Sequence, residues 1–330
     1  MAQAHRPPPL ETCPPEIRQS DKLPQKRAAL FFASSRMATS AGKAPLPQAM
    51  SSFNVSVCGV KLRVGPEPVR LCLTVGIIVL PVAGFLSHAE GIVAAIGTLL
   101  LAATLSSLFA TAFSDPGTIE REDSKQSCDS IGGQPPRLKH IVNGIEVYQK
   151  WCTTCKIYRP PRAKHCVFCD NCVLRFDHHC PWVSNCVGLR NHRYFLLFLV
   201  SCFLLTLYVF AAMVPLLMAS VEEPSFFNAS GFDAGFGIKL SLILFTFCML
   251  FPLASMVCYH FWLIALNKTT NEHVTMAYDK NPFDLGVVPN IRQFVLAAWG
   301  ENLLCPGKVD SLEVVAPSLK GKAESLEIDV

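Results

Sequence analysis

The segment between Cys152 and Cys186 carries a metal-ligand pattern that is written twice. Each copy reads C-x2-C-x9-H-x6-C, and the second copy begins fourteen residues after the first. Thiolates and imidazoles are the ligands that structural zinc takes, and two tetrahedral sites need eight of them. The pattern therefore predicts two structural zinc ions. The first copy consists of Cys152, Cys155, His165 and Cys172, and the second of Cys166, Cys169, His179 and Cys186.

These eight ligands can be divided between two metals in two ways. In the interleaved division each zinc takes one copy of the pattern, so the two sites alternate along the chain. In a sequential division one zinc would take Cys152, Cys155, His165 and Cys166. We prefer the interleaved division because it gives both sites the same local geometry. The metals would replace a hydrophobic core, since a structural zinc contributes about 10 kcal/mol or more of folding free energy.

One cysteine of this segment, Cys180, is left over when the ligands are counted. The dipeptide His165-Cys166 recurs as His179-Cys180, so Cys180 stands where a third Cys-x-x-Cys pair would begin. Its partner position holds Val183, which cannot bind a metal. Cys180 is therefore expected to be a free thiol.

The residues before Cys180 favour a nucleophile over an inert thiol. In an extended segment, residues two apart share a face, so His178 can meet Cys180 while His179 turns toward zinc. His178 would then take the thiol proton. Asp177 could fix the orientation of His178, as in Cys-His-Asp systems, but only if the backbone bends at Asp177.

The composition indicates a membrane protein with a cytosolic cysteine-rich part. Of the 330 residues, 51% are hydrophobic and only 16% are charged, whereas soluble domains carry about 25% charged residues. The odd number of cysteines, 15, and the Cys-x-x-Cys spacing indicate metal ligands in a reducing compartment rather than disulfides. The net charge of +4 comes without a basic patch interleaved with aromatic residues, so we expect no nucleic-acid partner.

Four apolar runs are long enough to cross a bilayer as helices. We expect an α-helical membrane protein with four transmembrane helices and a cytosolic, zinc-bound cysteine-rich domain between the second and the third. Buried helices of a soluble protein are the alternative, but four such runs in one chain are rare outside membranes. The expected divisions are a disordered cytosolic tail (1–60), spans at 71–88, 91–113, 194–218 and 238–266, a loop at 114–193 with the cysteine-rich domain at about 150–193, a lumenal loop (219–237) and a cytosolic tail (267–330).

Basic residues set the expected orientation of the spans. Residues 114–193 contain twelve Lys and Arg residues, and Lys61, Arg63 and Arg70 precede the first span. Residues 221–237, in contrast, contain no Lys or Arg. Both termini and the cysteine-rich domain are therefore expected in the cytosol, which agrees with their cysteine content. Cys180 would lie close to the membrane surface, because it precedes the third span by fourteen residues.

The sequence Asp177-His178-His179-Cys180 resembles the DHHC-type cysteine-rich domain of protein S-acyltransferases (palmitoyltransferases). The resemblance covers about residues 60–300 and departs from the family at no zinc or catalytic position. Its further motifs are Asp115-Pro116-Gly117, Arg159-Pro160-Pro161-Arg162, Asn185-Cys186-Val187-Gly188, Thr269-Thr270-Asn271-Glu272 and Asn281-Pro282-Phe283-Asp284-Leu285-Gly286.

The resemblance implies acyl transfer in two steps. Cys180 attacks the thioester of a fatty acyl-CoA, such as palmitoyl-CoA, and a cysteine of a membrane-associated substrate protein then takes the acyl group. The resemblance also supports the interleaved division, with both zinc ions structural. The acyl chain would lie between the spans, where burial of each methylene gains about 0.8 kcal/mol.

Other polar residues receive expected roles from this resemblance. The phosphates of CoA would meet cytosolic basic groups, although any one of these could simply face solvent or lipid headgroups. Trp182 would shape the acyl entrance or serve as an interfacial aromatic. The candidate CoA contacts are Arg159, Arg162, Lys164, Arg175, Arg190 and Arg193. Docking contacts between the tail and the spans are expected from Thr269, Thr270, Glu272 and Asn281.

Two other functions fit the sequence less well. A ring-type ubiquitin ligase would need a different ligand spacing, and a metal transporter would place its ligands inside the spans. Resemblance to one branch of the family suggests Ras-type GTPases as substrates, with an accessory subunit left open. The expected compartment is the Golgi or the endoplasmic reticulum, followed by the plasma membrane.

Overall fold

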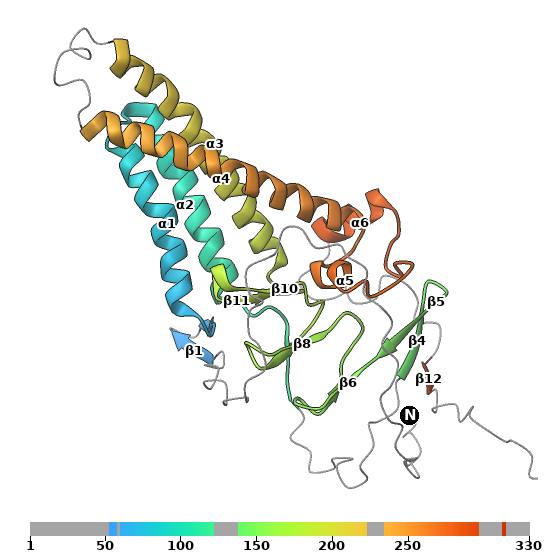
Figure 1. Cartoon of the computed structure of the whole chain (residues 1–330). Coiled ribbons are helices and arrows are strands. Elements are labelled where there is room, and N and C mark those ends of the chain that lie inside the picture. Colours follow the sequence, from blue (N-terminus) through green and yellow to red (C-terminus); the bar gives the residue numbers. More distant parts are fainter. Residues whose placement is uncertain (1–52, 58–59, 122–137, 223–233, 297–311, 315–330) are drawn as a thin grey trace, which may run out of the picture.

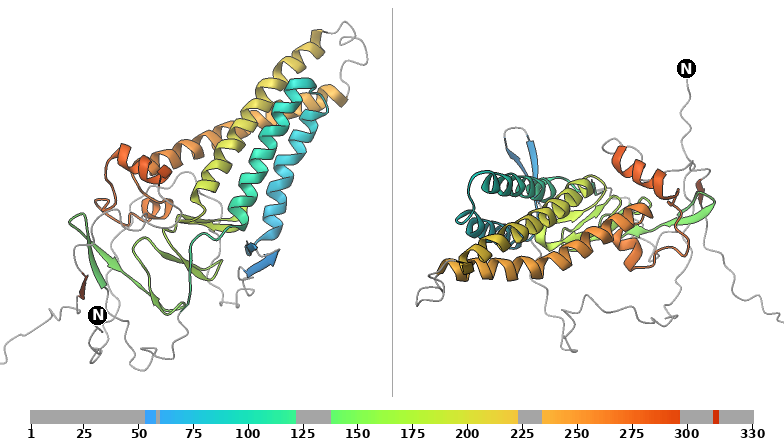
Figure 2. Two further views of the ribbon diagram at one scale, coloured as in Figure 1. Left: turned by 180° about the vertical axis from the view of Figure 1, so that it is seen from behind. Right: turned by 90° about the horizontal axis from the view of Figure 1, so that it is seen from above.

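Four long helices form a bundle, and short strands cover one end of it (Figures 1 and 2). The computed structural model describes residues 53–57, 60–121, 138–222, 234–296 and 312–314. Most of the expected N-terminal tail lies outside these residues, as does most of the expected lumenal loop. The end of that tail is ordered, since β1 (Phe53–Val57) pairs with β2 (Val60–Val64) as an antiparallel hairpin.

The four helices are long and apolar enough to cross a membrane, which fits a multi-pass membrane protein. They are α1 (Pro68–Leu86), α2 (Gly91–Phe113), α3 (His192–Glu222) and α4 (Ala234–Ala265). The range of α2 equals the predicted span, and α3 extends beyond its predicted span at both ends. The helices α1 and α4 begin before their predicted spans and end one or two residues before the predicted ends. Leu80 and Phe251 are more than 70% exposed, as expected of side chains that face lipid.

One hydrophobic core holds α1, α2 and α3 together, and α4 packs mainly on α3. Its largest fully buried side chains include Phe85, Phe195 and Met213. The core continues to the strand-covered end of the bundle, where it includes Cys180. The candidate nucleophile is thus embedded in the same apolar cluster as the spans.

Among the described residues between α2 and α3, seven short strands build the cysteine-rich part. Three small antiparallel sheets have the orders β6-β7, β3-β9-β8 and β10-β11. These strands are β3 (Thr118–Ile119), β6 (Trp151–Cys152), β7 (Ile157–Tyr158), β8 (Lys164–Cys166), β9 (Asn171–Val173), β10 (His178–Cys180) and β11 (Asn185–Val187). A short 3-10 helix, η2 (Pro181–Val183), connects β10 to β11 and packs on α1.

The chain after α4 returns to the cysteine-rich part through α5 (Thr270–Val274) and α6 (Val287–Leu296). Thr269 and Glu272 form a capping box that starts α5. A hairpin of β4 (Leu138–Val142) and β5 (Ile145–Gln149) packs Val142 and Val147 on Phe283, and β12 (Leu312–Val314) extends it. The segment after α4 is therefore a structural part of the site region.

Candidate active site and metal centres

The structure forms the interleaved division of the eight ligands. In each group, one ligand atom per residue lies within 4.8 Å of every other. Cys152, Cys155, His165 and Cys172 make one group, and Cys166, Cys169, His179 and Cys186 make the other. The sequential division would need Cys166 in the first group, which the geometry does not provide.

Two hairpins explain the His-x6-Cys spacing. His165 is paired with Cys172 across β8 and β9, and His179 is paired with Cys186 across β10 and β11. The Nδ1 atom of His179 lies 3.4 Å from Cys169 Sγ and 3.7 Å from Cys186 Sγ. Neighbouring ligand atoms of a tetrahedral zinc lie about 3.5 Å apart, given Zn–S of about 2.3 Å and Zn–N of about 2.0 Å. Both clusters therefore fit zinc.

In each metal group, the Nε2 atom of the histidine lies near a carboxylate. His165 Nε2 lies 3.6 Å from Asp170 Oδ1, and His179 Nε2 lies 3.3 Å from Glu67 Oε2. Such outer partners fix the tautomer and orientation of a ligating imidazole. Because Glu67 immediately precedes α1, and its backbone N–H donates to Ser184 Oγ at 2.8 Å, the second metal group is tied directly to the first span.

Cys180, His178 and Asp177 lie together in the geometry of a nucleophile, a base and an orienting group. In β10, His178 and Cys180 share one face and hydrogen-bond each other, while His179 points to the metal group. Asp177 lies just before the strand, and its Oδ2 accepts from His178 Nδ1 at 2.7 Å. The backbone thus makes the turn that this contact requires, after a left-handed Arg175 (φ 41°).

Electrostatics favour a thiolate–imidazolium pair at Cys180 and His178. Burial alone would raise the pKa of Cys180, but the hydrogen bond and charge of His178, with the backbone N–H groups of Val183 and Trp182, lower it overall. Burial would likewise lower the pKa of His178, but its contacts with Asp177 and Cys180 raise that pKa to about 10. Despite burial, the hydrogen bond from His178 holds the pKa of Asp177 well below its usual range.

The segment after α4 holds Asp177 from the other side. Thr270 N–H donates to Asp177 Oδ1 at 2.8 Å, and Asn271 N–H donates to the Asp177 carbonyl oxygen at 3.0 Å. Both donors belong to the first turn of α5, whose N-terminus favours a negative charge. Asp177 is fully buried, so these donors also satisfy a carboxylate that has left water.

Arg162 anchors α5 in place. Its Nε and Nη2 atoms donate to the two carboxylate oxygens of Glu272, each at 2.7 Å. Its Nη1 and Nη2 atoms also donate to Asn267, and its guanidinium lies 4.3 Å from the centre of the Phe283 ring. Asn281 Nδ2 completes the anchor by donating to the carbonyl oxygen of Leu266 at 2.7 Å.

The structure corrects two of the predicted CoA contacts. Arg162 and Arg175 are only 7% and 3% exposed, and both donate to Asn267 Oδ1, so neither guanidinium is presented to a phosphate in solution. Lys164 is partly buried and donates to Asn271 Oδ1 at 2.6 Å. The sequence could not separate these basic residues from surface ones, because their partners lie about a hundred positions away.

The other three basic candidates lie nearer the surface. Arg190 is exposed and pairs with Asp115. Arg159 is half-buried and donates to the carbonyl oxygen of Lys150, while Arg193 lies 6.0 Å from the Phe294 ring. Trp182 is 57% exposed on η2, and its carbonyl oxygen accepts from Thr74 of α1.

Sequence reasoning missed four residues of this region. Glu67 contacts His179 of the second metal group, and Asn267 accepts a hydrogen bond from Arg162. The other two, His192 and His260, lie beside Asp177. A signal existed for His260, because an ionisable residue inside an apolar run is a functional candidate by default. Glu67 and Asn267 carry no such local signal.

Comparison with known proteins matches the central part of the chain to a family. Residues 145–277 match the DHHC palmitoyltransferase family. The chain is 42% identical over 202 residues to the palmitoyltransferase ZDHHC9 of Danio rerio, which covers 57% of this chain and 51% of that protein. It is 37% identical over 213 residues to the Homo sapiens palmitoyltransferase ZDHHC14, a match that covers 58% of this chain and 43% of that protein. It is 34% identical over 267 residues to the probable protein S-acyltransferase 5 of Arabidopsis thaliana, a match that covers 73% of this chain and 56% of that protein. The chain thus spans about half the length of these curated relatives, and the resemblance seen in its sequence is confirmed.

Proposed function

Because the chain carries a DHHC palmitoyltransferase domain, we propose that it is a protein S-acyltransferase with Cys180 as its nucleophile. It transfers a fatty acyl group from an acyl-CoA, such as palmitoyl-CoA, to cysteine thiols of substrate proteins. The observation that carries this proposal is the position of Cys180, which contacts its base on one side and the apolar core of the spans on the other.

In the first step, Cys180 is acylated. Its thiolate attacks the thioester carbonyl carbon of acyl-CoA, and the new C–S bond forms as the bond to the CoA sulfur breaks. The imidazolium of His178 gives its proton to the leaving CoA thiolate. Asp177 keeps His178 in the tautomer whose other nitrogen faces the sulfur.

In the second step, the acyl group moves to the substrate protein. The neutral His178 takes the proton of the substrate thiol, and the resulting thiolate attacks the acyl carbon on Cys180. Cys180 leaves as a thiolate and pairs again with the imidazolium. One thioester has replaced another, so the overall reaction is near balance and needs no further source of energy.

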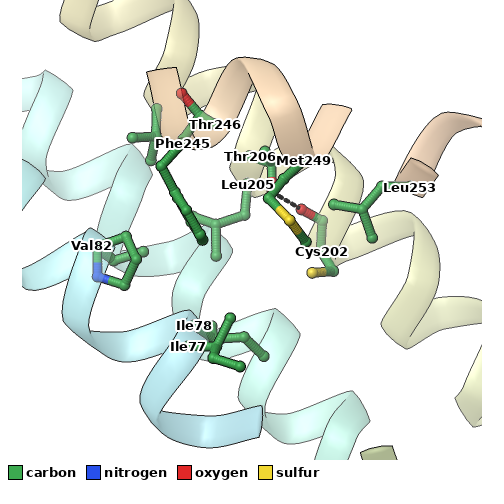
Figure 3. Close-up of a pocket in the computed structure, with 12 residues that line it drawn as sticks. Ile77, Ile78, Val82, Cys202, Leu205, Thr206, Phe245, Thr246, Met249 and Leu253 are labelled. Carbon is green, nitrogen blue, oxygen red and sulfur yellow. Dashed lines mark hydrogen bonds between the residues drawn. The ribbon is translucent and has the colours of Figure 1, made fainter. Parts of the chain in front are cut away.

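The acyl chain would extend from Cys180 into the bundle. The core cluster that contains Cys180 also contains Ile78, Val82, Leu205 and Val209, which line a cavity between α1, α3 and α4 (Figure 3). This cavity measures about 50 Å³, which is room for a few waters at about 10–15 Å³ each on this measure. The cavity is therefore too small for a long chain as it stands, and acylation would require its side chains to move apart.

CoA itself would remain at the cytosolic surface. Arg159, Arg190 and Arg193 are the basic groups that we assign to its phosphates, and Trp182 is assigned to the acyl entrance. The other polar candidates support the site instead. We assign Arg162, Glu272 and Asn281 to anchoring α5, Thr269 to starting that helix, and Thr270 to the contact with Asp177.

We assign one structural zinc ion to each of the two Cys3His groups. Each group has four protein ligands, so its coordination would be complete and the metal would supply folding energy rather than catalysis. Cys180 belongs to neither group.

Replacing Cys166 with alanine should lower the zinc content of the purified protein by about one ion per chain, because three ligands hold zinc less tightly. Replacing Cys180 with serine should leave it at about two. Metal analysis by mass spectrometry measures both. Loss of a zinc ion from the Cys180→Ser protein would show that the ligands have been assigned wrongly.

The membrane arrangement follows from the same assignment. Both termini, the active site and the acyl-CoA lie on the cytosolic side, and the substrates are membrane-associated proteins with cytosolic cysteines. We favour the Golgi or the endoplasmic reticulum, then the plasma membrane, as its location. Ras-type GTPases remain the proposed substrates, and an accessory subunit is compatible with this assignment.

The activity is tested by turnover in a detergent-solubilised preparation. Purified full-length protein with palmitoyl-CoA and a cysteine-containing peptide should release free CoA and produce a thioester-linked palmitoyl peptide. The Cys180→Ser protein should do neither, whereas Cys248→Ser, which changes an exposed thiol on α4, should match the unmodified protein. Equal turnover by the Cys180→Ser protein would refute the proposal.

A further inference from the structure

A second set of histidines surrounds Asp177 and takes no part in the steps above. His192, the first residue of α3, and His260, on α4, are each 3% exposed. One ring nitrogen of each lies within 4.8 Å of the other and of an Asp177 carboxylate oxygen. Among the residues that the structure describes, His192 Nε2 and His260 Nδ1 are buried atoms without a hydrogen-bond partner. Buried polar atoms of this kind are rare and call for an explanation.

Aromatic packing fixes the two rings in place. The Phe195 ring centre lies 5.1 Å from that of His260 and 5.1 Å from that of His178. The His192 and His260 ring centres are 6.0 Å apart, and Phe294 of α6 packs on His192 at 5.4 Å. Residues from α3, α4 and α6 thus hold these two imidazoles beside the carboxylate that orients the base.

The dimensions of the site suit a water molecule. Because no two of the three atoms are more than 4.8 Å apart, some point lies within about 2.8 Å of all three, which is the length of a hydrogen bond. The same bound would also admit zinc, which needs bonds of about 2.0–2.1 Å to the histidines, so the choice between water and metal rests on charge. An internal water needs two to four polar partners, and this site offers three.

The local charge disfavours a metal. The carboxylate of Asp177 already accepts a hydrogen bond from Nδ1–H of His178. The buried guanidinium of Arg175 lies close enough for its charge to act on both Asp177 and His192. A divalent cation would therefore sit between positive groups at low dielectric, whereas a neutral water would not.

We propose that His192 and His260 are positioning residues, which hold one water against Asp177 and thereby fix its carboxylate as the acceptor for His178. A carboxylate has about four lone-pair positions, and the contacts with His178 and Thr270 leave room for a third partner. The inference rests on the proposed acyl transfer, because its effect on catalysis is exerted through His178.

The test exploits the different nitrogens that lack partners. An asparagine side chain places its amide group near the position of Nδ1, and a glutamine places its amide near the position of Nε2. Asparagine should therefore replace His260, and glutamine should replace His192, but not the reverse. Rates of Cys180 acylation at saturating palmitoyl-CoA, and the KM for palmitoyl-CoA, are measured for six single variants and the unmodified protein.

We expect His260→Ala and His192→Ala to lower the acylation rate about tenfold without changing KM, since only the orientation of the base is lost. His260→Asn and His192→Gln should recover to within about twofold of the unmodified rate, whereas His260→Gln and His192→Asn should stay near the alanine variants. Zinc content is measured alongside, as a check that the cysteine-rich part remains folded.

Several outcomes would overturn the inference. The two amides could act alike at each position, or KM could rise with the rate unchanged. A third metal ion in the unmodified protein, lost from His260→Ala, would make the histidines metal ligands instead. If the unmodified protein is not acylated, the proposed function fails. The water site is then tested by the midpoints of thermal unfolding, which only His260→Asn and His192→Gln should restore toward the unmodified value.

Discussion

Replacing His178 with alanine is expected to slow the acylation of Cys180 about 100-fold at pH 7. Without the imidazolium, the pKa of Cys180 should rise toward its ordinary value of 9.0, because the effect of burial is then opposed less. Only about 1% of such a thiol is ionised at pH 7. Single-turnover acylation by palmitoyl-CoA, followed between pH 6 and pH 9, measures the effect.

The pH dependence identifies the cause. Because His178 lowers the pKa of Cys180, the rate of the unmodified protein should depend less steeply on pH than that of the variant, until His178 loses its proton near its pKa of about 10. The rate of the variant should instead rise about tenfold per pH unit below pH 9, so that the deficit shrinks as the pH rises.

A matched control is His88→Ala, because His88 lies in the connection between α1 and α2, at the other end of the bundle from Cys180. Its rate should equal that of the unmodified protein at every pH. A deficit in His178→Ala that stays constant across the pH range, or no deficit at all, would refute the ion pair.

Replacing Arg162 with alanine is expected to lower the free energy of unfolding by about 3–5 kcal/mol. Glu272 is only 6% exposed, and the substitution removes the guanidinium with which its carboxylate pairs. It also releases α5, whose first turn holds Asp177, so acylation should fall as well. Thermal and denaturant unfolding in detergent, with acylation assayed at low temperature, measure both effects.

Arg190→Ala supplies the control for a surface ion pair. The side chains of Arg190 and Asp115 are 50% and 40% exposed, and exposed pairs contribute about 0–1 kcal/mol. The double variant Arg162→Met with Glu272→Met should be less destabilised than Arg162→Ala, because no buried charge is left unpaired. Equal losses of unfolding free energy in Arg162→Ala and Arg190→Ala would contradict the anchoring role of Arg162.

Local patterns in the sequence predicted the elements that local physics determines. The His-x6-Cys spacing encodes two hairpins, so the division of the ligands followed from the repeat. The four apolar runs became four helices, but hydrophobicity marks only the part of a helix inside the membrane. Consequently α3 begins at His192 and ends at Glu222, beyond the predicted span of 194–218.

Contacts between distant segments could not be predicted in the same way. Arg162 and Glu272 are 110 positions apart, and nothing near Arg162 distinguishes a buried guanidinium from a phosphate-binding one. The Thr269-x-x-Glu272 spacing does predict a helix start, but not that this helix would donate its first N–H groups to Asp177. These contacts depend on how the segment after α4 packs on the cysteine-rich part.

The most direct test of the acyl-transfer account is the covalent state of Cys180. Purified full-length protein incubated with an alkyne-tagged palmitoyl-CoA should carry one label per chain, removable by neutral hydroxylamine and located by mass spectrometry on Cys180. The Cys180→Ser protein should carry no hydroxylamine-sensitive label while retaining its zinc content and its unfolding midpoint. Label of equal strength on the Cys180→Ser protein, or label located on another cysteine of the unmodified protein, would contradict the account.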